Sequence, residues 1–388
     1  MTNVKGFKDS WILTEDGLRK TNLIIKDGVI NSLDDEIVDE AGDELIKLDD
    51  DKLVIPGLID QHIHGALGVD AIDGSIDAIH KMACALGREG VTAFLPTTTN
   101  QSIEVINKSL KSIKEYMEKN YDDGAEVLGA HLEGPFICRK YAGAQIPEYI
   151  LKPSVEVFKR FENESGNTIK LVTLAIEEDK DNLVEYLKSK GVVISIGHSA
   201  AGYEDVKKGI ENGVTCVTHT YNGMRPLRRA EIGTVGSTFL FDELYSELIC
   251  DGVHSSPPAV KLLWKNKPAD KLILVSDALR TKYMPDGKYY ELEQVIILNG
   301  KEARLEDGKL AGSVLQLNDA IKNLMEFTGA DFIDAIKCAC ENPAKNLNVF
   351  DKMGSIKENK VANLVIIDRD LNVYQTIRNG KVIYNKDI

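Results

Sequence analysis

Short apolar runs rich in valine, isoleucine and leucine recur along the middle of the chain, separated by longer segments with helical periodicity. Strands that alternate with helices pair in parallel through right-handed crossovers. Eight such runs occur, at positions 53–59, 91–96, 126–132, 169–175, 192–196, 215–218, 248–250 and 271–275. They predict an α/β protein built on a (β/α)8 barrel of the TIM type, in which side chains at the carboxyl ends of the strands form the active site.

The two ends of the chain have a different pattern. Residues 1–52 and 352–388 contain short apolar runs separated by turn signals, such as the hairpin signal Asp27-Gly28. We therefore expect the termini to join in one small β domain of the sandwich type, beside a barrel domain of residues 53–351. Segment 281–310 carries turn signals at Pro285-Asp286-Gly287 and Asn299-Gly300, and predicts a hairpin inserted after the eighth strand.

Composition and charge narrow the class of protein. The 388 residues are 43% hydrophobic and 28% charged, as in soluble globular proteins. No apolar stretch approaches the ~20 residues that span a bilayer, and the first residues have no signal-peptide pattern, so we expect a cytoplasmic protein. The net charge of −14 argues against a nucleic-acid or membrane partner, but not against a small anionic ligand. The six cysteines lack Cys-x-x-Cys spacing and are predicted to be buried, reduced thiols.

Candidate metal ligands stand where the apolar runs end. His62 and His64 are two residues apart, so on a strand they face the same side. An isolated His-x-His pair arises by chance about half of the time, but five of the seven histidines lie at predicted strand ends: His62, His64, His131, His198 and His219. Glu133 also lies at such an end. Imidazole and carboxylate groups suit zinc and similar ions, which favours a metal-dependent hydrolase.

These motifs resemble a known family. The segment from Pro56 to Gly65 resembles the first metal motif of the amidohydrolase superfamily, and further segments resemble, in order, its N-acetylglucosamine-6-phosphate deacetylase family: His131–Phe136, Gly197–Ser199, His219–Met224, Asp251–His254, Val275–Ala278, Leu310–Ser313 and Glu341–Ala344. The resemblance covers nearly the whole chain. It implies hydrolysis of the acetamide of N-acetyl-D-glucosamine 6-phosphate to D-glucosamine 6-phosphate and acetate, in amino-sugar catabolism. It also implies one or two divalent metal ions per subunit, zinc first, with iron, manganese or cobalt as alternatives.

The resemblance assigns roles to residues of the predicted metal centre. It makes Glu133, His198 and His219 the main metal ligands, and His62 and His64 the ligands of a second site that only some members keep. Asp277 matches the residue that transfers the proton from water to the leaving amine; its alternative role is a helix N-cap. His131 is interpreted as a supporting partner of the ligands rather than as a ligand.

Substrate contacts are implied less directly. His254 matches a histidine that contacts the substrate in the family. The alternative is that it is an ordinary loop histidine whose hydrogen bonds are satisfied within the protein. Asn222 and Gly223 match positions that hold the sugar phosphate. The family usually has an arginine where this chain has Ala230, so the resemblance implies that Arg228 or Arg229 binds the phosphate instead. The alternative is that these two arginines only form a solvent-exposed face of the loop. In the family this loop can reach a neighbouring subunit, which implies a homodimer.

The remaining positions concern the acetyl group and the hydroxyls. Gln145, after Ala144, stands where many relatives have histidine; glutamine can bond a hydroxyl but cannot move a proton. Leu310, Ala311 and Gly312 could cover the acetyl methyl or simply pack. His80 lies in a helical pattern and is interpreted as structural. A deacetylase of N-acetylgalactosamine 6-phosphate or of another N-acyl compound is the first alternative function, and a non-enzymatic sugar-phosphate sensor is the second.

Overall fold

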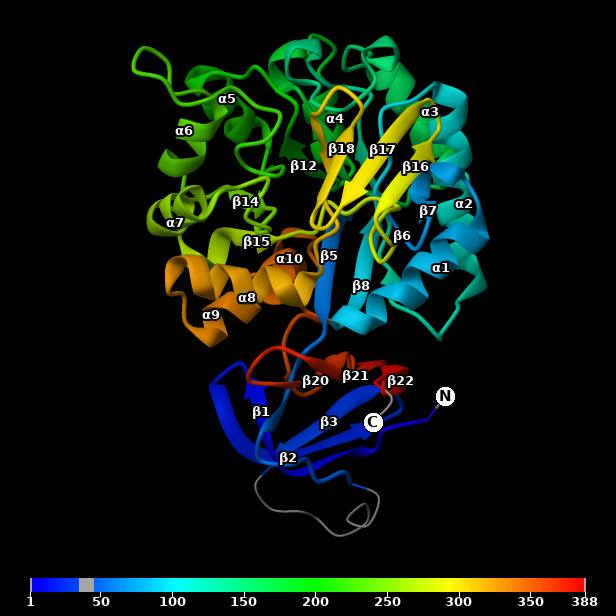
Figure 1. Cartoon of the computed structure of the whole chain (residues 1–388), viewed down its shortest axis with the longest axis vertical. Helices are drawn as coiled ribbons and strands as arrows, with labels where there is room; N and C mark the ends of the chain where they lie inside the picture. The colour runs from blue at the N-terminus through cyan, green and yellow to red at the C-terminus, as the bar shows by residue number, and fades with distance from the viewer. Residues whose placement is uncertain (1, 35–44, 387–388) are drawn as a thin grey trace.

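The computed structural model describes residues 2–34 and 45–386. It has a small part made of strands from both ends of the chain and a larger part in which strands and helices alternate (Figure 1). The predicted mixed α/β class is therefore confirmed.

The terminal strands form one seven-stranded sheet in the order β22-β21-β20-β4-β1-β2-β3. Their bounds are β1 Gly6–Thr14, β2 Gly17–Lys26, β3 Val29–Asp34, β4 Lys52–Pro56, β20 Leu364–Asp368, β21 Val373–Arg378 and β22 Lys381–Asn385. The Asp27-Gly28 turn joins β2 to β3, as predicted. Buried side chains from both termini, including Phe7, Leu23 and Ile377, share one apolar cluster. The two ends of the chain thus fold together, whereas a sandwich of two sheets stays a prediction.

One predicted strand is in fact two. The run 53–59 divides at Gly57, so that β4 pairs with β1 and β20 in the terminal sheet, whereas β5 begins at Leu58 and pairs with β8. A side chain at Gly57 would come within 2.2 Å of Thr92 Oγ1. The chain therefore crosses from one sheet to the other at a residue that only glycine can occupy without displacing its neighbour.

Parallel strands form the centre of the larger part. They make a three-stranded sheet, β5-β8-β9, and a six-stranded sheet, β10-β11-β12-β13-β14-β15. Their bounds are β5 Leu58–Ile63, β8 Val91–Pro96, β9 Glu126–Val127, β10 Ala130–Glu133, β11 Ile169–Leu174, β12 Val193–Ile196, β13 Cys216–Val217, β14 Tyr245–Leu248 and β15 Leu272–Leu274. The run predicted at 126–132 divides at Gly129, and the strand predicted at 248–250 lies earlier. Closure of these strands into one eight-stranded barrel stays a prediction.

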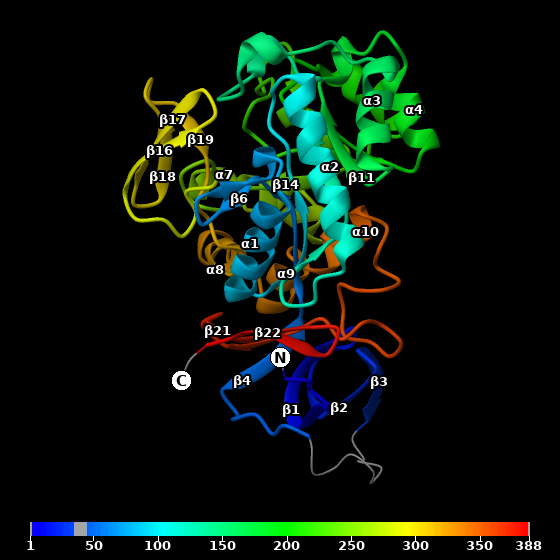
Figure 2. The same ribbon diagram turned by 90° about the vertical axis from the view of Figure 1, so that its right-hand side faces the viewer.

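Helices pack around the parallel strands (Figures 1 and 2). They are α1 Ile76–Leu86, α2 Ile103–Lys119, α3 Val155–Ser165, α4 Leu183–Ser189, α5 Tyr203–Asn212, α6 Gly233–Leu240, α7 Pro257–Asn266, α8 Leu317–Thr328, α9 Phe332–Lys337 and α10 Glu341–Asn346. Their apolar faces bury side chains such as Ile79, Leu110 and Phe161 in the main core. Within the described ranges, no helix combines the length and apolar character needed to cross a membrane.

The segment after β15 is larger than the predicted hairpin. Four antiparallel strands, β16 Gly287–Glu291, β17 Gln294–Asn299, β18 Glu302–Leu305 and β19 Leu310–Gly312, stand at one side of the larger part (Figure 2). The turn predicted at Asn299-Gly300 joins β17 to β18. The last strand returns to the centre, where the Ser313 amide donates to the Asp277 carbonyl at 2.9 Å. The inserted sheet therefore lies directly beside a predicted site residue.

Candidate active site and metal centre

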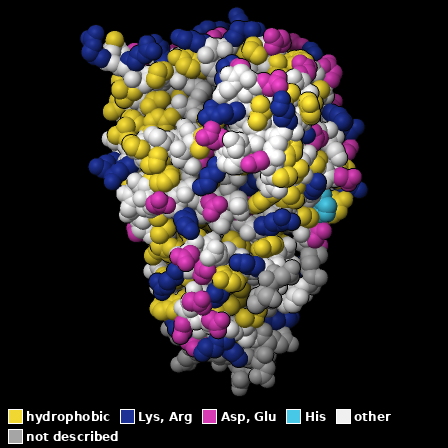
Figure 3. Space-filling view, in the orientation of Figure 1, with side chains coloured by type: hydrophobic (Ala, Val, Ile, Leu, Met, Phe, Trp, Pro, Cys, Tyr) yellow, Lys and Arg dark blue, Asp and Glu magenta, His cyan; other side chains and the backbone are white. Residues whose placement is uncertain are grey.

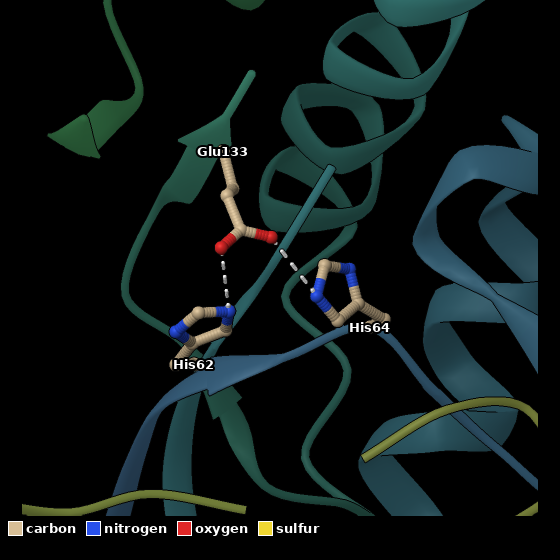
Figure 4. A group of neighbouring side chains, drawn as sticks. All are labelled: His62, His64 and Glu133. Carbon is tan, nitrogen blue, oxygen red and sulfur yellow. Dashed lines mark ion pairs between the residues drawn. The ribbon is translucent and has the colours of Figure 1, made fainter. Parts of the chain in front are cut away.

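Two histidines and one glutamate meet at the end of β5. His62 lies on β5 and His64 follows it, while Glu133 is the last residue of β10. His62 Nε2 is 3.5 Å from Glu133 Oε1, and His64 Nε2 is 3.3 Å from Glu133 Oε2 (Figure 4). The predicted pairing of His62 and His64 on one side of a strand end is thus what brings both rings to the same carboxylate.

The ends of β12 and β13 bring two more imidazoles to Glu133. Its Oε1 lies 3.3 Å from His198 Nε2 and 3.1 Å from His219 Nε2. His198 Nδ1 contacts the Tyr141 carbonyl at 2.8 Å, which turns the other ring nitrogen toward the glutamate. His198 and His219 have φ angles of 46° and 28°, a region that such side chains rarely adopt. Local strain of this kind is typical of functional sites.

The two groups fit divalent metal ions. In each of the sets His62–His64–Glu133 and Glu133–His198–His219, one ligand atom per residue lies within 4.8 Å of the others, and all five residues are buried. His62 Nε2 has no hydrogen-bond partner although it is buried. Burial alone would raise the pKa of Glu133, but the surrounding imidazoles outweigh it and hold that pKa well below its ordinary value. An ionised carboxylate shared by four imidazoles is a suitable donor set for one or two cations.

Asp277 lies against the same group, three residues after β15. Its Oδ1 is 3.1 Å from His64 Nε2 and 3.4 Å from His62 Nε2. Burial would raise its pKa, but the charges of these two histidines lower it to about 2, so the carboxylate is ionised at neutral pH. The alternative role as a helix N-cap is wrong, because the next described α-helix, α8, begins only at Leu317.

The contacts of His131 suit a residue that supports the candidate metal ligands rather than one that binds a metal itself. Its Nδ1 contacts Thr97 Oγ1 at 3.2 Å and its Nε2 contacts Thr173 Oγ1 at 2.8 Å, so neither nitrogen is free for a metal. Its ring meets the ring of His62 edge-on, with the centroids 4.5 Å apart. Burial and neighbouring imidazoles lower the pKa of His131, which therefore stays neutral.

Sequence reasoning missed the group behind the histidines. Glu247, on β14, is fully buried, and its Oε2 is 3.0 Å from His62 Nδ1 and 3.2 Å from the His219 amide. Its Oε1 accepts from Gln61 Nε2 at 2.7 Å, and Gln61 Oε1 accepts from Asn346 Nδ2 at 3.0 Å. A lone glutamate in an apolar run carries no motif, so only the assembled strands could reveal it.

A cavity of about 150 Å³ opens above the cluster. Most of the predicted site residues line it: His64, Glu133, Ala144, Gln145, His198, His219, Asn222, Gly223, His254, Asp277, Leu310, Ala311 and Gly312. The lining also includes residues that sequence reasoning did not identify, namely Thr99, Gly143, Leu279, Glu291, Gln294 and Ile296. Three of these belong to β16 and β17, so the inserted sheet forms one wall of the cavity.

Two predicted substrate residues have partners inside the protein. Gln145 donates from Nε2 to Glu133 Oε2 at 3.1 Å, while its Oε1 accepts from Thr99 Oγ1 at 2.8 Å and from a backbone amide. His254 Nδ1 is 2.7 Å from Asp251 Oδ2. Burial lowers the pKa of His254, but Asp251 outweighs that effect and raises it. Both side chains are therefore held in fixed orientations at the cavity.

Arg228 and Arg229 lie apart from the cavity. Both are exposed, on the loop between β13 and α6. Arg228 forms an antiparallel bridge with Glu231, which closes the loop on itself. Dark blue basic side chains are visible on the face of the molecule that Figure 3 shows, including its upper left tip. Neither arginine is among the residues that line the cavity.

Comparisons with known proteins identify the family of the chain. The amidohydrolase family model matches residues 53–383. The chain is 39% identical over 381 residues to an N-acetylglucosamine-6-phosphate deacetylase of Bacillus subtilis (strain 168), covering 97% of this chain and 96% of the relative. It is 34% identical to an N-acetylgalactosamine-6-phosphate deacetylase of Escherichia coli O157:H7, over 96% and 97% of the two chains. The crystal structure of the N-acetylglucosamine-6-phosphate deacetylase of Thermotoga maritima matches with a TM-score of 0.88 and 33% identity, over 98% and 100%. The chain belongs to the amidohydrolase family.

Proposed function

We propose that this protein hydrolyses the acetamide of N-acetyl-D-glucosamine 6-phosphate, releasing acetate and D-glucosamine 6-phosphate. The observation that carries the proposal is the position of Asp277, an ionised carboxylate 3.1 Å from His64 at the floor of the cavity. A carboxyl group must be ionised before it can accept a proton as a base. The names of the B. subtilis and T. maritima relatives support the same substrate.

In the proposed reaction Asp277 does the proton transfer. One oxygen of its carboxylate accepts a proton from the attacking water, whose oxygen bonds to the acetamide carbon. The same proton then passes to the amide nitrogen as the carbon–nitrogen bond breaks, which leaves acetate and the free amine. Because Asp277 is only 9% exposed, bulk water is largely kept away from this transfer.

The metal centre and the cavity walls assist that step. We propose that Glu133, His198 and His219 hold one divalent ion, zinc first, and that His62 and His64 with Glu133 hold a second. Such an ion, when bound, would polarise the carbonyl and lower the pKa of water toward ~7. Leu310, Ala311 and Gly312 supply an apolar wall that suits the acetyl methyl.

The phosphate end of the substrate is assigned to the loop after β13. Asn222 and Gly223 line the cavity there, and backbone amides in such loops bind anions. Arg228 and Arg229 are exposed and lie apart from the cavity of their own chain. We therefore propose a homodimer in which they bind the phosphate in the partner's cavity. A cytoplasmic location goes with this metabolic role.

The architecture belongs to the same proposal. Thr97 after β8 bridges in parallel to His131 on β10, and the Asp277 amide after β15 donates to the His62 carbonyl on β5 at 2.8 Å. These two contacts support closure of the parallel strands into one (β/α)8 barrel. Residues 53–351 then form the barrel domain, and residues 1–52 with 352–388 form the small β domain.

The deciding experiment measures acetate release by metal-loaded protein. The substrates are N-acetylglucosamine 6-phosphate, N-acetylgalactosamine 6-phosphate and unphosphorylated N-acetylglucosamine. Asp277→Asn is compared with wild type and with Asp370→Asn, a control at an exposed position far along the chain. We expect turnover that depends on the phosphate and that falls by about 10²–10⁴-fold in Asp277→Asn only.

Two outcomes would change the conclusion. Faster turnover of the galacto substrate would move the assignment to the activity named for the E. coli relative. No acetate from any of the three sugars would refute the deacetylase proposal.

A further inference from the structure

A second group of ligand-type side chains lies outside the cavity, between α1 and the loop that precedes β9. It consists of His80, Cys84 and Asp123. His80 and Cys84 are four residues apart on α1, so they share one face of the helix. Asp123 belongs to the loop between α2 and β9. From the sequence His80 is predicted to be structural, because it lies in a helical pattern far from any predicted strand end.

The three ligand atoms have the spacing of a zinc site. His80 Nε2 is 3.4 Å from Asp123 Oδ2 and 3.7 Å from Cys84 Sγ, and the three atoms lie within 4.8 Å of one another. In a tetrahedral zinc site the bonds are about 2.0 Å to nitrogen or oxygen and about 2.3 Å to sulfur. Two ligand atoms of such a site are therefore about 3.3 Å apart when they are nitrogen and oxygen, and about 3.5 Å apart when they are nitrogen and sulfur. The observed separations are within a few tenths of an ångström of these values.

A proton relay does not explain the arrangement. A cysteine–histidine–carboxylate relay uses one ring nitrogen for the thiol and the other for the carboxylate. Here both partners contact the same nitrogen, Nε2, whereas His80 Nδ1 has no hydrogen-bond partner. Asp123 Oδ1 is also buried without a partner. Convergence of three donor atoms on one point suits a bound cation.

The backbone holds the three residues in place without an ion. The Ala125 amide donates to the Ala83 carbonyl at 2.9 Å, which fixes the loop against α1. A Cβ at Gly124 would be 2.9 Å from the Cys84 amide nitrogen, so the loop packs directly on the helix. From the terminal sheet, Arg378 Nη1 donates to the carbonyls of Tyr121 and Gly124 at 2.7 and 3.0 Å. Binding of an ion would therefore require little further ordering.

The group is open to solvent. The side chains of His80 and Asp123 are 30% and 44% exposed. All six cysteines lie within the described residues, and five are buried as predicted; Cys84 is the exception. An ion can thus enter from the surface, and a water molecule can take the fourth position.

We propose that His80, Cys84 and Asp123 form a separate site for a thiolate-preferring divalent ion such as Zn²⁺. The ion links α1 to the loop 121–124, which Arg378 ties to the terminal sheet. The site is distinct from the cavity cluster, whose ligands include no cysteine. The proposal does not depend on the deacetylase activity.

Cobalt titration of the full-length protein tests the site, because a thiolate-to-cobalt charge-transfer band reports only ions bound by cysteine. A phosphine reductant keeps the thiols reduced. Wild type is compared with Cys84→Ser and with the matched control Cys138→Ser. Cys138 is a buried cysteine that lies near the carboxylates of Glu177 and Glu178. We expect the band in wild type and in Cys138→Ser. In Cys84→Ser we expect the band to disappear and the protein to bind one equivalent of cobalt less than wild type. Absence of the band in wild type, or its persistence in Cys84→Ser, would overturn the proposal.

Protection from alkylation gives a second readout that does not use a variant. Zn²⁺ alone is expected to slow iodoacetamide labelling of Cys84 by about tenfold, because a metal-bound thiolate is a poorer nucleophile. Equal labelling rates with Zn²⁺ and with a chelator would contradict the site. Acetate release by Cys84→Ser should equal that of wild type, which separates this site from the catalytic one.

Discussion

Glu247 offers a test of how the proposed metal centre is held. Its carboxylate is fully buried and accepts from His62 Nδ1, from the His219 amide and from Gln61 Nε2. The bond to His62 fixes the ring so that Nε2 faces Glu133. We predict that Glu247→Gln, a change of one oxygen to an amino group, weakens metal binding without unfolding the protein.

The size of the effect follows from the hydrogen bonds. The side-chain amide of the glutamine in Glu247→Gln has only one accepting oxygen, whereas both carboxylate oxygens of Glu247 accept hydrogen bonds. Whichever way this amide is turned, its amino group faces a donor, either Gln61 Nε2 or the pair formed by His62 Nδ1 and the His219 amide. A lost hydrogen bond to a charged group costs about 1.5–3 kcal/mol. At about 1.36 kcal/mol per decade, that corresponds to about 10- to 150-fold weaker binding, in the range found when partners of metal ligands are removed.

The assay is a zinc competition titration of metal-free protein against a chromophoric chelator. The larger loss is expected at the site that contains His62, because its side chain contacts Glu247 directly. Glu162→Gln is the matched control, since Glu162 is also a buried glutamate but contacts Tyr186 and Lys190 and touches no proposed ligand. Zinc affinity of folded Glu247→Gln within about twofold of wild type would refute the reasoning.

Three further predictions follow from other contacts. Glu89→Gln should lower the free energy of unfolding in urea by about 3–5 kcal/mol, because it leaves the buried charge of Lys282 unpaired; a loss below about 1 kcal/mol would show that the pair is not needed. Gln145→Ala should reduce kcat/KM for deacetylation about tenfold through loss of its bond to Glu133, and unchanged kinetics would contradict that role. Burial lowers the pKa of Lys267 to about 8, so above that pH the folded protein binds fewer protons than the unfolded chain, and stability should rise toward pH ~10.5. Lys267→Met should remove this rise in unfolding experiments at several pH values; an identical pH profile in the variant would show that Lys267 does not cause it.

Much of the proposed metal centre was predictable because its candidate ligands follow a local rule. His62, His64, Glu133, His198 and His219 each stand where an apolar run ends, and the parallel strands bring these ends together. Alternation along one strand also placed His62 and His64 on the same side. The resemblance to the amidohydrolases then predicted the proton-transfer role of Asp277, whose carboxylate lies beside both histidines; that role stays a prediction.

The errors have specific causes. The runs 53–59 and 126–132 each contain a glycine where the chain changes sheet or breaks the strand, at Gly57 and at Gly129. Hydrophobicity continues across both positions, so a pattern of apolar residues does not reveal the break. The inserted segment was predicted as one hairpin from two turn signals, whereas a third, Asp307-Gly308, joins β18 to β19 and the segment forms four strands.

The sequence by itself determined the family, the alternation of strands and helices, and the residue types that meet at the strand ends, since these depend on local pattern and short motifs. Tertiary structure alone decided that Glu247 supports His62, that the inserted sheet forms a wall of the cavity, and that Asp123 faces His80. The reason is physical: a hydrogen bond or an ion site depends on distances between side chains far apart in the chain, and packing of the whole fold fixes those distances.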